Sequence, residues 1–148
     1  MVLDAHQGAN RFTAKARLAL AVAALSLLVP LAMAAWLRPD PNGFGTHQQL
    51  GLPPCTIVWM FGFRCPSCGM TTSWSHAVRG QWLQAIGCNA GGALLAAMAM
   101  VAGPWLLVSA MRGRWLVGRP GDRTLALIAS AVIATTLFDW VYRLGFQG

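Results

Sequence analysis

Hydrophobic positions gather into three long runs along the chain. Residues 18–37 and residues 90–111 contain no charged side chain, and residues 124–142 contain one, Asp139. Each run has about 20 residues, the length at which an α-helix crosses the hydrocarbon core of a bilayer. The pattern therefore predicts an all-α membrane protein with three transmembrane helices.

The stretch between the first two runs has another pattern. Prolines and glycines punctuate residues 38–54, which predicts a loop. Residues 55–63 are apolar but too short to span a bilayer. We expect them to form either a buried strand-like piece or one arm of a shallow re-entrant segment packed among helices.

A helical period begins after Gly69. Met70, Trp74 and Val78 fall on one face of this helix, and Gly80 divides the period into two short helices. An amphipathic helix lying in the membrane interface explains such a face. Between the first and second spans we therefore predict a cysteine-bearing re-entrant or interfacial helical hairpin, within a motif region at residues 52–89. Residues 1–148 are expected to form a single membrane domain.

Composition supports a membrane protein. Hydrophobic residues make up 56% of the 148 residues and charged residues 10%, whereas about a quarter of a soluble domain is charged. The net charge of +7 comes from arginines that flank the hydrophobic runs and form no stripe on a polar helix. The lipid bilayer, and not nucleic acid, is the expected partner.

The positive charges also predict an orientation. Seven of the eleven Lys and Arg residues lie before the first run or between the second and third: Arg11, Lys15, Arg17, Arg112, Arg114, Arg119 and Arg123. Cytoplasmic segments carry such an excess, so these two segments are expected in the cytoplasm. The cysteine region and the C-terminus then face the opposite side.

The first run also has features of a signal peptide. Its flank is basic, and Ala32-Met33-Ala34 fits a small-residue cleavage site that would remove residues 1–34. The apolar run continues past that site through Trp36, which favours an uncleaved transmembrane helix.

The chemistry of the chain is concentrated in its four cysteines. Cys65-Pro66-Ser67-Cys68-Gly69 has the spacing that lets two thiolates reach one metal ion or each other. A structural zinc site needs four ligands, and the candidates are Cys55, Cys65, Cys68, Cys88 and His76, with His47 as a substitute for one of them.

Two other readings of the cysteines stay open. In the first, the cysteines form one or two disulfides or remain buried apolar side chains. In the second, Cys65 and Cys68 are the redox pair of a membrane thiol-disulfide oxidoreductase. No βαβ pattern surrounds the pair, which disfavours a thioredoxin-like enzyme. We expect a non-catalytic protein that acts with a membrane protein partner or as a homo-oligomer.

The motif region resembles a known family. The residues that carry the resemblance are Pro54-Cys55, Cys65-Pro66-Ser67-Cys68-Gly69-Met70-Thr71, His76, Gly80, Ala85 and Asn89. They are similar to the bacterial membrane protein family called domain of unknown function 2752. The resemblance implies a bacterial inner membrane protein and no activity. In a bacterium, the orientation predicted from the positive charges would place the cysteine motif on the periplasmic side. Many members carry Arg after the motif threonine, where this chain has Thr72.

One charge lies inside a hydrophobic run. Asp139 is near the end of the third run, where an unpaired carboxylate is costly. Arg143, four residues further on, is the local partner on a helix. Arg64 and Arg79 are the alternatives, because the predicted topology brings them to the same side of the membrane.

Overall fold

The computed structural model describes residues 11–146, which are helical with no strand. The elements are α1 (Ala14–Trp36), the 3₁₀ helix η2 (Thr46–Leu50), α2 (Thr56–Phe61), α3 (Met70–Ala77), α4 (Trp82–Cys88), α5 (Ala90–Arg112) and α6 (Asp122–Phe146). Three helices are long and apolar enough to cross a membrane: Ala14–Trp36, Ala90–Arg112 and Asp122–Gly145. The all-α prediction with three candidate spans is therefore confirmed. Residues 1–10, part of the segment that signal cleavage would remove, lie outside the described residues.

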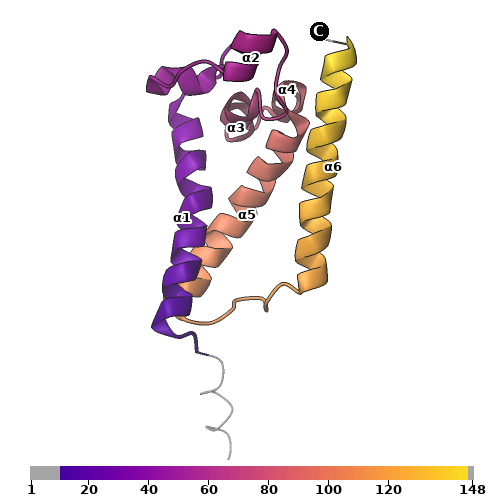
Figure 1. Ribbon diagram of the computed structural model, residues 1–148. Coiled ribbons are helices and arrows are strands. Elements are labelled where there is room, and N and C mark those ends of the chain that lie inside the picture. Colours follow the sequence, from indigo (N-terminus) through magenta and orange to yellow (C-terminus); the bar gives the residue numbers. More distant parts are fainter. Residues whose placement is uncertain (1–10, 147–148) are drawn as a thin grey trace, which may run out of the picture.

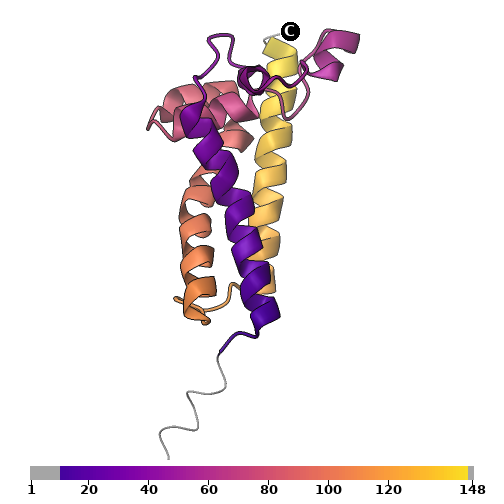
Figure 2. The same ribbon diagram turned by 90° about the vertical axis from the view of Figure 1, so that its left-hand side faces the viewer.

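The three long helices form a bundle that carries the short helices at one end. In Figures 1 and 2, α1 and α5 run in opposite directions, and α6 stands beside α5. The short helices α3 and α4 lie at the end of the bundle where α5 begins and α6 ends. The loop between α5 and α6 is at the other end, near the start of α1. The backbone N–H of Phe12 donates to the carbonyl of Gly113 there, over 2.7 Å.

Small side chains allow the helices to approach closely. The core cluster consists of Leu31, Ala77, Ala85, Ala93, Ala96 and Ala99. A Cβ built on Gly91 would lie 2.9 Å from Cβ of Thr136 on α6, and one on Gly103 would lie 2.7 Å from Leu28 on α1. Helices in lipid gain stability from such close packing, because no hydrophobic effect drives them together.

Two arginines donate hydrogen bonds to the free carbonyls at the C-terminal ends of neighbouring helices. The Arg79 guanidinium donates to the carbonyls of Ala34, Ala35 and Leu37 at the end of α1, over 2.7 to 3.2 Å. Arg17 donates to the carbonyls of Ala110 and Met111 at the end of α5, over 2.9 and 3.0 Å. The last carbonyls of a helix have no partner within it and carry partial negative charge, so each guanidinium ties its own segment to the next helix.

The cysteine region departs in detail from the sequence pattern. The apolar stretch at residues 55–63 forms α2, which is a helix without a buried residue, and not a buried strand-like piece. The helical period after Gly69 does divide at Gly80, whose φ is +74°, into α3 and α4. The re-entrant or interfacial hairpin remains a prediction.

Candidate metal centre

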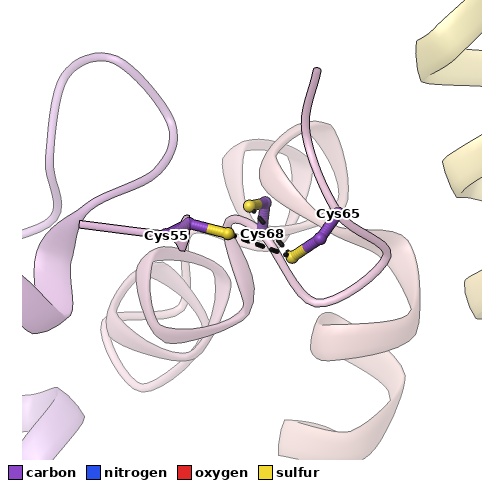
Figure 3. Close-up of side chains that lie close together, drawn as sticks. All are labelled: Cys55, Cys65 and Cys68. Carbon is purple, nitrogen blue, oxygen red and sulfur yellow. Dashed lines mark hydrogen bonds between the residues drawn. The ribbon is translucent and has the colours of Figure 1, made fainter. Parts of the chain in front are cut away.

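Three of the four cysteines bring their sulfur atoms together. Cys55 directly precedes α2, and Cys65 and Cys68 lie in the turn before α3 (Figure 3). The Sγ atoms of Cys65 and Cys68 are 3.1 Å apart, and those of Cys55 and Cys65 are 3.6 Å apart. All three sulfurs lie within 4.8 Å of one another. No pair is near the S–S bond length of about 2.0 Å, so the cluster is a group of free thiols.

The turn between Cys65 and Cys68 is closed by its own backbone. The N–H of Cys68 donates to the carbonyl of Cys65 over 3.0 Å, and the N–H of Ser67 bonds to the Cys65 sulfur. The Ser67 hydroxyl lies 3.2 Å from the same sulfur. Backbone N–H groups directed at sulfur favour its thiolate form, which is the form that binds metals.

Asn89 holds this turn to the start of α5. Its side-chain amide donates to the carbonyls of Pro66 and Cys68, over 2.9 and 3.1 Å. Its side-chain oxygen accepts the N–H of Gly92 over 2.6 Å, so the same residue is also the N-cap of α5. Asn89 is completely buried, and the only sequence signal for it was its place in the family pattern.

Residues of α6 hold the turn from the other side. The Arg143 guanidinium donates to the carbonyl of Cys68 over 3.0 Å and to that of Cys88 over 3.5 Å. The Trp140 indole N–H donates to the carbonyl of Arg64 over 2.8 Å. The sequence analysis missed this role, because these residues are more than 70 positions away from the turn along the chain.

Arg143 also forms an ion pair with Asp139. Its Nη2 lies 2.8 Å from the Asp139 carboxylate, and the two side chains are 3% and 13% exposed. Arg64 instead lies over the Phe44 ring, with its guanidinium carbon 4.3 Å from the ring centroid, and Arg79 closes α1. The local pair predicted for a helix is therefore the one that forms.

The buried thiols of Cys65 and Cys68 and the half-buried thiol of Cys88 differ in acidity. Burial opposes ionisation of Cys65, but hydrogen bonds with Ser67, Cys68 and Cys55 outweigh it and lower the pKa of Cys65. Burial and the hydrogen bond with Cys65 raise the pKa of Cys68 to about 12. Burial also raises the pKa of Cys88, against the attraction of Arg64 and Arg143. Cys65 is therefore the thiol of this pair that ionises first.

A cavity of about 380 Å³ opens beside the sulfurs. Cys55, Cys65 and Cys68 line one part of it, and Phe44 and His47 line another. A ligand in this cavity would therefore have direct access to the cluster.

Two residues predicted as ligands lie outside the cluster. Cys88 is half-buried at the end of α4, and a Cβ added to Gly43 would lie 3.6 Å from its sulfur. His76, on α3, has its Nδ1 2.6 Å from the side-chain oxygen of Gln81. Neither belongs to the group of sulfurs within 4.8 Å, and neither lines the cavity.

Thr72, the residue after the motif threonine, has a packing role. It is completely buried on α3, and its hydroxyl lies 2.8 Å from that of Thr46. Thr46 also accepts the N–H of Asp40 over 3.0 Å. These bonds attach the loop before η2 to the helix that follows the cysteine turn.

Comparison with known proteins supports the family resemblance over part of the chain. Neither the curated proteins nor the solved structures contained a match. Residues 55–103 match the profile of a family described as a protein of unknown function. This range contains all three cysteines of the cluster, Asn89 and α5 as far as Gly103. Over these residues the chain resembles the DUF2752 family.

Proposed function

We propose that this chain is a small, non-catalytic membrane protein that binds a zinc ion through Cys55, Cys65 and Cys68. The observation that carries the proposal is the convergence of three free sulfurs from two segments within 4.8 Å. Cysteine thiolates are the preferred ligands of structural zinc. The ion would tie the segment before α2 to the turn before α3.

The spacing of the sulfurs supports such a site. In tetrahedral coordination with Zn–S bonds of about 2.3 Å, neighbouring sulfurs are about 3.8 Å apart. The separation of 3.6 Å between Cys55 and Cys65 is close to this value. The 3.1 Å between Cys65 and Cys68 requires only a small opening of the turn.

The surrounding charge also supports a metal–thiolate centre. Zinc with three thiolates carries one net negative charge. Arg143 lies behind the turn and donates to the carbonyl of Cys68. Arg64 directly precedes Cys65 in the sequence. Arg143 is already paired with Asp139, so Arg64, whose guanidinium lies over the Phe44 ring at the cavity, is the cation that could offset part of the charge of the thiolates.

The second candidate is a thiol-disulfide oxidoreductase. The observation that favours it is the unequal acidity of the closely spaced pair, in which the pKa of Cys65 is lowered and that of Cys68 is raised to about 12. A thiolate beside a protonated thiol is typical of redox pairs. Cys55 is superfluous in this alternative, whereas it is a ligand in the metal proposal.

We further propose the bacterial inner membrane as the location, with the cysteine region on the periplasmic side. The support is the family resemblance and the arginine distribution. The exposed apolar helices indicate the lipid bilayer as a partner. We also propose that the chain acts together with a membrane protein partner or with a second copy of itself.

Metal analysis combined with thiol counting tests the proposal on purified, detergent-solubilised protein. We expect about one zinc per chain and three thiols that react with a maleimide only after a chelator has removed the ion. Replacing Cys55, Cys65 or Cys68 by Ser should each lower the zinc content strongly. Cys88→Ser is the matched control, because Cys88 is a half-buried thiol outside the cluster.

The variants also separate the two candidate functions. A Cys65/Cys68 double variant should be about as impaired as either single variant, because ligands of one ion act as a unit. Protein without metal that cycles between dithiol and disulfide forms, and in which Cys55→Ser has no effect, would support the oxidoreductase. Zinc loss in Cys88→Ser equal to that in Cys55→Ser would contradict the assigned ligands.

A further inference from the structure

The proposed three-cysteine site leaves one position of a tetrahedral zinc without a protein ligand. Structural sites have four protein ligands, and open sites have three with a water or a substrate. The residues around the cavity therefore decide what fills the fourth position. The only imidazole among the described residues that line it belongs to His47, on η2.

One hydrogen bond determines which ring nitrogen of His47 is available. Its Nε2 lies 3.3 Å from the carbonyl oxygen of Pro53. A carbonyl only accepts, so Nε2 carries the proton and donates. In the neutral ring Nδ1 is then unprotonated, with its lone pair free. Histidines that bind metals commonly donate their other ring N–H to a backbone carbonyl in this way.

The same bond ties the histidine to the cysteine cluster. Pro53 lies two positions before Cys55, and Pro54 and Cys55 line the cavity together with His47. The ring is thus oriented by the segment that carries one of the three proposed thiolate ligands. Two prolines in succession stiffen this segment, so the orientation is maintained.

Two other polar side chains at the cavity already have hydrogen-bond partners. The Thr72 hydroxyl is bonded to Thr46, and the Ser67 hydroxyl lies 3.2 Å from the Cys65 sulfur. His76, the histidine named from the motif, does not line the cavity. Imidazole is also a far better zinc ligand than a hydroxyl or an amide.

We propose that Nδ1 of His47 is the fourth ligand and completes a three-cysteine, one-histidine zinc site. The proposal rests on the proposed metal function. His47 lies outside the group of sulfurs within 4.8 Å, so its ring and the cluster must approach each other when the ion binds. Gly45 and Gly51, with φ of +98° and +76°, flank η2 and are the backbone positions there that adapt most easily.

X-ray absorption at the zinc edge of the purified full chain tests the ligand set. We expect three sulfurs and one nitrogen, with the outer-shell scattering of an imidazole. In His47→Ala the imidazole scattering should disappear while zinc remains bound to three sulfurs. Zinc loss to a chelator should become roughly tenfold faster or more, the scale on which weakened ligation changes metal affinity. His76→Ala is the matched control and should resemble the wild type.

Added imidazole provides a second measurement on the same variant. The cavity leaves room for the free ring beside the cluster, so imidazole should restore the nitrogen scattering and slow the zinc loss of His47→Ala. A His47→Gln variant serves the same purpose if the alanine variant does not fold. Wild-type protein that holds zinc without imidazole scattering would overturn this inference alone. Wild-type protein that holds no metal would overturn the proposed function as well.

Discussion

Gly69 is the most crowded of the glycines in the cysteine region. A Cβ at this residue would be 2.5 Å from the carbonyl oxygen of Cys88 and 2.8 Å from that of Gly43. Its φ of +84° is also in the left-handed region, which side chains other than glycine rarely adopt. Glycine therefore lets three segments meet directly behind Cys68.

Replacing Gly69 by Ala should destabilise the protein more than the same change at Gly62. Gly62 has a similar φ of +74° but nothing within 4 Å of an added Cβ, so Gly62→Ala measures the conformational strain alone. Overpacking typically adds about 1–3 kcal/mol to the loss of unfolding free energy. Unfolding of both variants in detergent would measure the difference. Equal losses would mean that the crowding around Gly69 relaxes without cost.

At the scale of elements, α6 is anchored mainly by one end. Most of its side chains are exposed to the surroundings, and α5 is the long helix that it contacts. Near its C-terminal end, Trp140 and Arg143 donate hydrogen bonds to carbonyls of the cysteine region. The attachment of the third span is therefore linked to the integrity of the candidate metal centre.

Arg143→Ala should be far more damaging than Arg119→Ala. Both arginines pair with an aspartate on α6, but the pair of Arg143 is buried and that of Arg119 is 72% and 91% exposed. Removing Arg143 leaves Asp139 as an uncompensated charge, which typically costs about 3–5 kcal/mol. An exposed pair contributes little.

Thermal unfolding of the two arginine variants in detergent checks this prediction. Adding Asp139→Asn to Arg143→Ala should recover part of the loss, because the unpaired carboxylate is then removed. If the two arginine variants unfold alike, α6 is held by its apolar contacts and not by Arg143.

At the scale of the whole molecule, the structure places the two arginine-rich segments together. The start of α1 and the loop at residues 113–121 lie at one end of the bundle, and the cysteine region lies at the other (Figure 1). The prediction that both arginine-rich segments face one side thus agrees with the arrangement of the helices. Which side is the cytoplasm stays a prediction from the positive charges.

Reporter fusions decide the orientation. We expect a fusion within residues 113–121 to report the cytoplasm and a fusion after Gly148 to report the periplasm, because short cytoplasmic loops retain Lys and Arg. With alkaline phosphatase as the reporter, which is active only in the periplasm, an inactive fusion at the first site and an active fusion at the second would agree with this orientation. The reverse pattern would invert the molecule and expose the cysteines to the reducing cytoplasm.

The hydrophobic pattern alone determined the helical class and the positions of the long helices. A segment in lipid must satisfy its own backbone hydrogen bonds, so length and apolarity are sufficient to indicate a spanning helix. The close placement of Cys65 and Cys68 follows from their spacing in the same way, because two residues on one tight turn remain neighbours whatever surrounds them. Arg143 could be matched with Asp139 because the two lie four apart on a helix.

Only the tertiary structure decided which distant residues complete the site. Cys55 joins the sulfur cluster and Cys88 does not, although both are about equally plausible from the sequence. Asn89 and Arg143 hold the cysteine turn through bonds to its carbonyls. Such contacts depend on how α5 and α6 pack against the turn, and no local pattern encodes that packing. The sequence thus specifies the helices and the turn, and helix packing selects the partners that meet there.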